Sequence, residues 1–264
     1  MTRLPYDQAH GLRRLFAQAG TVFIPVVSNP NVAFGGVMLE RLCTAFAEQG
    51  RRTLVVDASE RACEHAEMAL LDLGECIEPL SAHVSYLVAR GLPIKFVDAT
   101  GSTGGFLPAL ADAAPDCDTV LVHAPAADLC RLFARHHEVQ PVRPLLIADD
   151  QPASVTHAYA SMKVLSQRAG LVVHDLLLCS PERSSRRAER IAMQIATCAD
   201  DFLGAVLRDW APIDPACAAT ERPTKALRRL VREQLRSVAE HAVAVDPPVW
   251  STVRQVDYTG AAAF

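Results

Sequence analysis

The residues that could do chemistry follow short apolar runs of the sequence. A loop at residues 28–37 follows the first run and contains Gly35 and Gly36, Asp57 ends the second run, and His123 ends a later one. The backbone N–H groups of such a loop can bind phosphate, and an Asp nearby can hold a metal ion. Ligands of open α/β sheets bind at the carboxyl ends of the strands, so the loops after these three runs form the candidate site.

The apolar runs are expected to be buried strands. They are rich in Val, Ile and Leu without polar alternation, which is the pattern of a strand covered on both faces. The expected strands are residues 22–27, 53–56, 94–97, 119–122, 144–147, 171–178 and 205–207, and the expected helices include residues 37–49, 155–168 and 184–202. Alternation of this kind predicts an α/β domain with a mostly parallel central sheet flanked by helices.

The first strand–loop–helix unit resembles the P-loop of the MinD/ParA ATPases, which have a three-layer α/β fold of the SIMIBI class. Such proteins open with a loop close to KGGVGKT, and a helix then leads into a strand that ends in an Asp, here Asp57. At the family's spacing, Gly35 stands at the position of the phosphate-binding Lys and Gly36 at that of the Mg²⁺-binding Thr. Pro30 stands at the position of an additional signature Lys, and His123 at that of a later Mg²⁺-linked Asp.

The resemblance therefore implies a degenerate Walker A loop that has lost its chemistry. Both lysines and the hydroxyl are missing, and proline supplies no N–H, so a bound triphosphate would lack its main charge compensation. The expected vestigial nucleotide site has no cofactor and no metal ion and consists of Pro30, Asn31, Gly35, Gly36, Asp57 and His123. Two alternatives stay open: the loop binds ATP through unusual ligands, or the register is different and there is no P-loop ancestry.

Residues 152–165 resemble the segment PEPTSLTDAYALIKVL of the flagellar branch of MinD-like proteins, the FlhG or FleN regulators of flagellar number. The segment departs from that pattern at His157, where an acidic residue is usual. It is expected to be a helix capped by Ser154 or Thr156 after Pro152. Its apolar residues recur at helical spacing, so it indicates the family and packs in the core rather than carrying chemistry.

The N-terminal segment, residues 5–19, is expected to be a partner-binding helix. It contains the DQAxxLR pattern that precedes the ATPase core in the flagellar branch, where it stimulates FlhF, a GTPase of the signal-recognition-particle type. An apolar stripe suits a helix that binds a partner, and Gln8 could orient the attacking water of that GTPase. The partner-binding residues implied are Asp7, Gln8, Ala9, Leu12, Arg13, Leu15 and Phe16. The alternative is a helix packed on its own sheet with Gln8 solvated.

Residues 224–243 predict an amphipathic helix with one apolar and one basic face. The apolar positions are Leu227, Leu230, Val231, Leu235 and Val238, and the basic ones are Lys225, Arg228, Arg229, Arg232 and Arg236. A final core helix with a solvated basic face is favoured. A helix that binds anionic lipid is the alternative.

Composition limits the function classes. The 264 residues are 50% hydrophobic and 21% charged with a net charge of −4, which argues against direct binding of nucleic acid by the whole protein. The eight cysteines show no CxxC pair and are expected to be free thiols. No apolar run of membrane-spanning length occurs. A cytoplasmic location is expected, with membrane contact peripheral at most and recruitment to the cell pole or the inner membrane surface left open.

Together these observations favour a regulator of flagellar number or placement that stimulates an FlhF-type GTPase and is not itself an ATPase. The expected organisation is an activator helix at residues 1–19, a MinD-like α/β domain at 20–246 and a flexible tail at 247–264. Flagellar assembly or transcription factors are left open as further partners. The alternatives are an ATP-dependent MinD/ParA-like ATPase with an unusual site, or a scaffold in another polar-organelle or secretion system.

Overall fold

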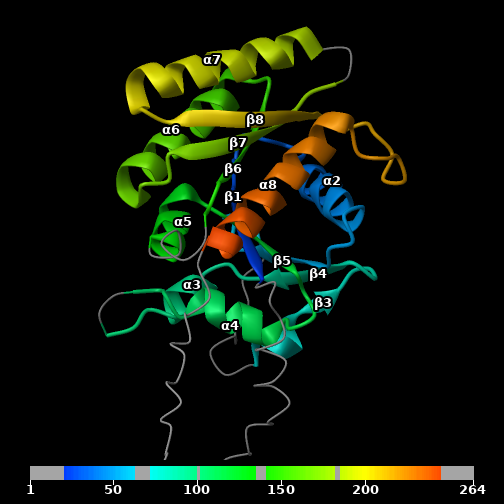
Figure 1. Cartoon of the computed structure of the whole chain (residues 1–264), viewed down its shortest axis with the longest axis vertical. Helices are drawn as coiled ribbons and strands as arrows, with labels where there is room; N and C mark the ends of the chain where they lie inside the picture. Colours follow the sequence, from blue (N-terminus) through cyan, green and yellow to red (C-terminus); the bar gives the residue numbers. More distant parts are fainter. Residues whose placement is uncertain (1–20, 63–71, 100–101, 135–140, 182–184, 245–264) are drawn as a thin grey trace, which may run out of the picture.

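A computed structural model describes residues 21–62, 72–99, 102–134, 141–181 and 185–244 (Figure 1). The strands are β1 (Val22–Val27), β2 (Thr53–Asp57), β3 (Glu78–Pro79), β4 (Val84–Val88), β5 (Thr119–Ala124), β6 (Leu145–Asp149), β7 (Val173–Cys179) and β8 (Val206–Ile213). The helices are α2 (Gly35–Ala47), α3 (Leu92–Lys95), α4 (Phe106–Ala113), α5 (Ala126–Phe133), α6 (Pro152–Ala169), α7 (Ser185–Leu203), α8 (Lys225–Ala244) and the 3₁₀ turn η1 (Leu73–Cys76).

The strands form one sheet in the order β3-β4-β2-β5-β1-β6-β7-β8. The short edge strand β3 is antiparallel to β4, and the other strand pairs are parallel. The first strand lies between β5 and β6, so the chain leaves β1 at the point where the strand order reverses. Every residue of β1 is buried, as its unbroken apolar run predicts.

Helices cover both faces of the sheet, which confirms the expected three-layer α/β fold. On one face α2 and α8 lie side by side and bury Met38, Leu42, Phe46 and Leu230 against the strands (Figure 1). The opposite face is covered by α4, α5, α6 and α7. These two layers fix the ends of the strands, and with them the loops that could carry a site.

One predicted strand is wrong. Residues 94–97 are not a strand: Leu92–Lys95 form the short helix α3, which follows Gly91 in a left-handed conformation with φ 73°. Pro93 occupies the first turn, where its fixed φ and missing N–H are tolerated. The place beside β2 is taken by β4, whose mixed sequence VSYLV does not form a continuous apolar run.

The predicted helices that fall within the described residues exist, with shifted ends. The helix α6 begins at Pro152 after Gln151, so neither Ser154 nor Thr156 caps it. Ser154 instead lies buried inside the first turn, where its hydroxyl accepts a hydrogen bond from the backbone N–H of Asp149. In α8, Leu227, Leu230 and Val231 are buried, which confirms a final core helix.

Several expectations fall outside the described residues. The activator helix, with Asp7, Gln8, Leu12 and its other partner-binding residues, and the tail at 247–264 are among them. The domain boundaries therefore stay predictions. Within the part of the chain that the structure describes, no helix is long and apolar enough to cross a membrane.

Candidate functional site

A cleft of about 280 Å³ opens at the carboxyl ends of the central strands. It is lined by the loop after β1, the first turn of α2, the end of β2 and the residue His123 on β5. The structure thus brings together the predicted residues Pro30, Gly35, Gly36, Asp57 and His123. Asn31 is exposed beside this cleft and does not line it. The position agrees with the rule that ligands of open α/β sheets bind where the strand order reverses.

The two glycines at the start of α2 have ordinary backbone conformations. Neither Gly35 nor Gly36 has a positive φ, and a Cβ atom added at either would meet nothing within 4 Å. No side chain caps α2, and the preceding Phe34 is 51% exposed. The local geometry therefore does not require glycine at these two positions, and larger side chains would fit there.

Asn29 fixes the loop after β1 from within the protein. Its amide Nδ2 donates to the carbonyl oxygens of Ile147 at 2.8 Å and Ser154 at 3.0 Å. Its Oδ1 accepts the backbone N–H of Asn31 at 3.1 Å, and its own carbonyl accepts the N–H of Val32 at 3.1 Å. Two N–H groups of the loop are therefore already used, and the residue between Asn29 and Asn31 is a proline.

Arg61 ties the same loop to the segment after β2. Its guanidinium donates to the carbonyl oxygen of Val32 at 3.1 Å and to that of Pro30. A P-loop turns its N–H groups toward a phosphate, whereas here loop carbonyl oxygens accept from a cation of the protein itself. Arg61 was not among the residues predicted for the site.

Asp57 is held from three directions. His123 Nδ1 lies 3.0 Å from Asp57 Oδ1, the Tyr86 hydroxyl donates to Oδ2 at 2.9 Å, and the Ser59 N–H donates to Oδ1 at 3.1 Å. Burial by itself would raise the pKa of Asp57, but the hydrogen bond and charge of His123 together with the Ser59 bonds bring that pKa well below its usual range. Both carboxylate oxygens therefore have donors from the protein.

Among the residues that the structure describes, no cluster of three or more His, Cys, Asp or Glu side chains is arranged to hold a metal ion. Both oxygens of Asp57 already have donors from the protein, so most acceptor positions of this carboxylate are occupied.

Sequence reasoning missed Asn29, Arg61 and Tyr86. Asn29 and Arg61 lie next to predicted positions, yet their partners are backbone oxygens that a sequence pattern does not reveal. Tyr86 lies on β4, the strand that was not predicted, and its register beside β2 places it opposite Val55. The β-branched and aromatic residues of VSYLV are the one signal that could have indicated this strand.

Comparison of the sequence with protein-family models and with curated proteins gives no match. Solved structures do resemble the chain. The MinD cell division protein of Aquifex aeolicus matches with a TM-score of 0.51 and 12% identity, covering 86% of this chain and 99% of that one. Cobyrinic acid a,c-diamide synthase from Mycobacterium smegmatis, with bound ADP and magnesium, matches with a TM-score of 0.51 and 16% identity, covering 82% and 94%. At these identities the likeness concerns the fold, and the chain has the α/β fold of MinD-like proteins.

Proposed function

We propose that this chain is a MinD-like regulatory protein without ATPase activity of its own. The observation that carries the proposal is the state of Asp57, whose two carboxylate oxygens are bonded to His123, Tyr86 and Ser59. In a P-loop ATPase an Asp at the end of this strand has to be free to act beside the nucleotide and its Mg²⁺ ion. Here the protein's own side chains occupy it.

The loop after β1 supports the same proposal. Phosphoryl transfer depends on charge compensation by loop N–H groups, a Lys and a metal ion. The N–H groups of Asn31 and Val32 are bonded to Asn29, Pro30 has none, and Gly35 and Gly36 supply neither an amine nor a hydroxyl. A triphosphate in this cleft would therefore meet few donors.

We further propose that the chain regulates flagellar number or placement by stimulating an FlhF-type GTPase through its N-terminal segment. This finer proposal rests on the DQAxxLR pattern and on the resemblance of residues 152–165 to the flagellar branch. The MinD-like fold supports it, since the flagellar regulators share that fold. The scarcity of phosphate donors in the cleft supports a mode of action in which the partner, not this chain, hydrolyses nucleotide.

Two measurements test the proposal. Isothermal titration with ATP and Mg²⁺ is expected to show no binding, and a dissociation constant below about 100 μM would contradict the inactive site. GTP turnover by an FlhF-type GTPase from the same organism is expected to rise when the full chain is added. An unchanged turnover would refute the flagellar role while leaving the inactive site untouched.

A further inference from the structure

A second cavity lies at the amino-terminal ends of the strands, opposite the candidate site at their carboxyl ends. It has a volume of about 420 Å³ and is lined by residues just before β6 and β7, by Arg208 on β8, and by Glu233, Arg236 and Ser237 on α8. These are the amino-terminal ends of the strands, whereas the first cleft lies at the carboxyl ends. The two cavities are therefore independent of one another.

Arg143, which lines this cavity, is a buried cation with unused donors. Its side chain is only 7% exposed, and its Nε and one Nη atom have no hydrogen-bond partner among the described residues. A buried charged donor without an acceptor is costly because its lost hydration is not replaced, so native proteins normally supply one. A group outside the described side chains is therefore expected to accept hydrogen bonds from this guanidinium.

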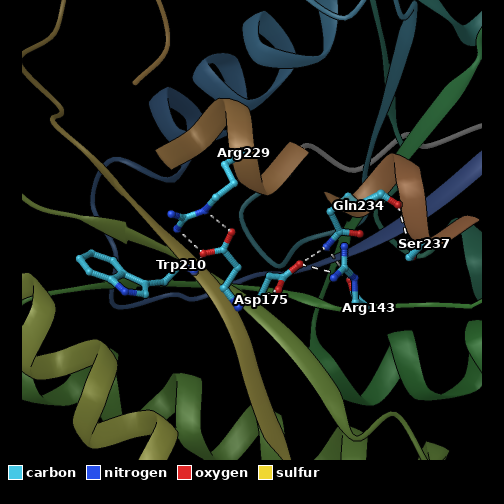
Figure 2. A network of polar contacts seen from close by, with 7 residues as sticks. Arg143, Asp175, Trp210, Arg229, Gln234 and Ser237 are labelled. Carbon is cyan, nitrogen blue, oxygen red and sulfur yellow. Dashed lines mark hydrogen bonds and ion pairs between the residues drawn. The ribbon is translucent and has the colours of Figure 1, made fainter. Parts of the chain in front are cut away.

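Asp175 balances the charge of Arg143 but gives its Nε no hydrogen bond. Its Oδ2 forms an ion pair with Arg143 Nε at 3.8 Å, beyond hydrogen-bond distance, and accepts the Gln234 amide at 2.7 Å (Figure 2). Its Oδ1 accepts the N–H of Asp209 at 3.1 Å. Gln234 also donates to the carbonyl oxygen of Arg143 at 3.2 Å, which fixes the backbone of the arginine in place. The neighbouring Arg229 donates two hydrogen bonds to Asp209.

The rest of the cavity lining contains both cationic and apolar side chains. Arg208 and Arg236 join Arg143 in its lining, and the one acidic residue there, Glu233, accepts a hydrogen bond from Arg236 at 3.1 Å. The remaining lining includes Val142, Leu171 and Val173. A planar guanidinium binds carboxylate and phosphate groups in a bidentate manner, and an apolar wall suits the body of an organic molecule.

We propose that this cavity binds a small organic oxyanion, whose carboxylate or phosphate group is held by Arg143 with Arg208 and Arg236 around it. The cavity volume falls in the range of small-molecule sites, about 300–1,000 Å³. The ligand supplies the acceptors that the buried guanidinium lacks. Occupancy stabilises the segments that lead into β6 and β7 and the part of α8 at residues 233–237, which contribute to the lining.

Thermal unfolding of the full chain tests the proposal with three probes, namely inorganic phosphate, phenyl phosphate and benzoate, against chloride at matched ionic strength. The site is expected to raise the Tm by about 2–4 °C at a tenfold excess over the dissociation constant. A response to both phosphates assigns a phosphate site, and a response to benzoate alone assigns a carboxylate site. If no probe raises the Tm more than chloride does, the proposal is wrong and water is the acceptor for Arg143.

Variants locate the effect. Arg143→Met is expected to weaken the binding of the responding probe at least tenfold, and the double variant Arg208→Gln/Arg236→Gln severalfold. The double variant also decides the matter if Arg143→Met does not fold, because both of its side chains are on the surface side of the cavity wall. Arg232→Gln, which removes the same charge from α8 outside the lining, is the matched control and should bind as wild type. Binding that survives both Arg143→Met and the double variant would place the anion elsewhere.

Discussion

Asp57 and His123 come from neighbouring parallel strands and meet at the carboxyl edge of the sheet. Their side chains are only 16% and 12% exposed, so water screens the contact little. The lowered pKa of Asp57 makes this carboxylate a stabilising group above its ordinary pKa of 3.8, and the contribution is lost as the pH falls below that value. Asp57, which the resemblance places in a vestigial nucleotide site, therefore contributes to the stability of the fold.

His123→Gln is expected to reduce the free energy of unfolding at pH 7 by about 1–3 kcal/mol, because Asp57 loses a charge-assisted hydrogen bond. The loss should shrink below pH 4, where Asp57 in the variant is protonated in both states. Urea unfolding at pH 7 and pH 3 measures both effects. His83→Gln, at an exposed histidine, is the control. An unchanged stability of His123→Gln at pH 7 would remove the anchoring role.

Substitutions of Gln8 and Leu12 should have different effects if the N-terminal segment acts on a partner GTPase. Leu12→Ala is expected to weaken partner binding, since it removes an apolar side chain whose burial by the partner would be worth about 1–3 kcal/mol. Gln8→Ala is expected to leave binding nearly intact and to lower the stimulated GTP turnover. Titration calorimetry and a turnover assay with the full chain distinguish the two. Full stimulation by Gln8→Ala would reduce the segment to a docking element.

At the scale of elements, α2 and α6 use glycine differently. Gly35 and Gly36 begin α2 with open space around them, whereas Gly170 ends α6 with φ 67°, where its N–H bonds the carbonyl oxygen of Ser166. Only the second position needs glycine, because other residues are strained at positive φ.

The double variant Gly35→Ala/Gly36→Ala is therefore expected to stabilise the protein by up to about 1 kcal/mol through a lower entropy of the unfolded chain. Gly170→Ala is expected to destabilise it by about 1 kcal/mol. Thermal and urea unfolding measure both. A loss of stability in the double variant would indicate that the first turn of α2 needs glycine for a reason absent from the geometry of the free protein.

His174 and Asp175, two adjacent residues of β7, should change the free energy of unfolding in opposite directions as the pH changes. Burial lowers the pKa of His174 to about 4, so its contribution to stability is present above 6.5 and is lost as the pH falls toward 4. Burial raises the pKa of Asp175 to about 6 against the charge of Arg143, so its contribution is present below 3.8 and is lost as the pH rises toward 6. The two effects nearly cancel between pH 4 and 6.

Substitution should uncover each effect. Relative to wild type, Asp175→Asn is expected to lose up to roughly 3 kcal/mol of stability on acidification from pH 6.5 to 4.5, because His174 then acts alone. His174→Gln is expected to gain a similar amount over the same range. Urea unfolding at three pH values gives both slopes. Parallel pH profiles for the two variants would show that neither side chain titrates in this window.

At the scale of the whole molecule, the proposed absence of nucleotide binding predicts that this protein lacks a nucleotide switch. A ligand shifts an equilibrium between states only through different affinities for them, and a ligand that does not bind shifts nothing. The chain is therefore expected to keep one oligomeric state with and without ATP and Mg²⁺. Light scattering measures this, and ATP-dependent dimerisation would contradict both this prediction and the inactive site.

The sequence by itself determined the layers of this protein. Unbroken apolar runs such as residues 22–27 and helical periodicities such as that of residues 155–168 are local patterns, and burial on both faces imposes them on each element separately. The sequence also predicted that residues 30, 35, 36 and 123 lie at one site, because the carboxyl ends of parallel strands converge. The strand β4 was missed because all its side chains except Leu87 are only partly buried, and Ser85 interrupts its apolar run.

Only the tertiary structure decided what these residues do. His123 and Tyr86 reach Asp57 from 66 and 29 positions away, and Asn29 binds a carbonyl oxygen 118 positions along the chain. Arg143 keeps unused donors because Gln234 donates to the Asp175 oxygen that lies nearest to it. Such pairings depend on strand order, register and the packing of α8, and none of these leaves a periodic signal, because a hydrogen bond constrains two single positions rather than a repeating face.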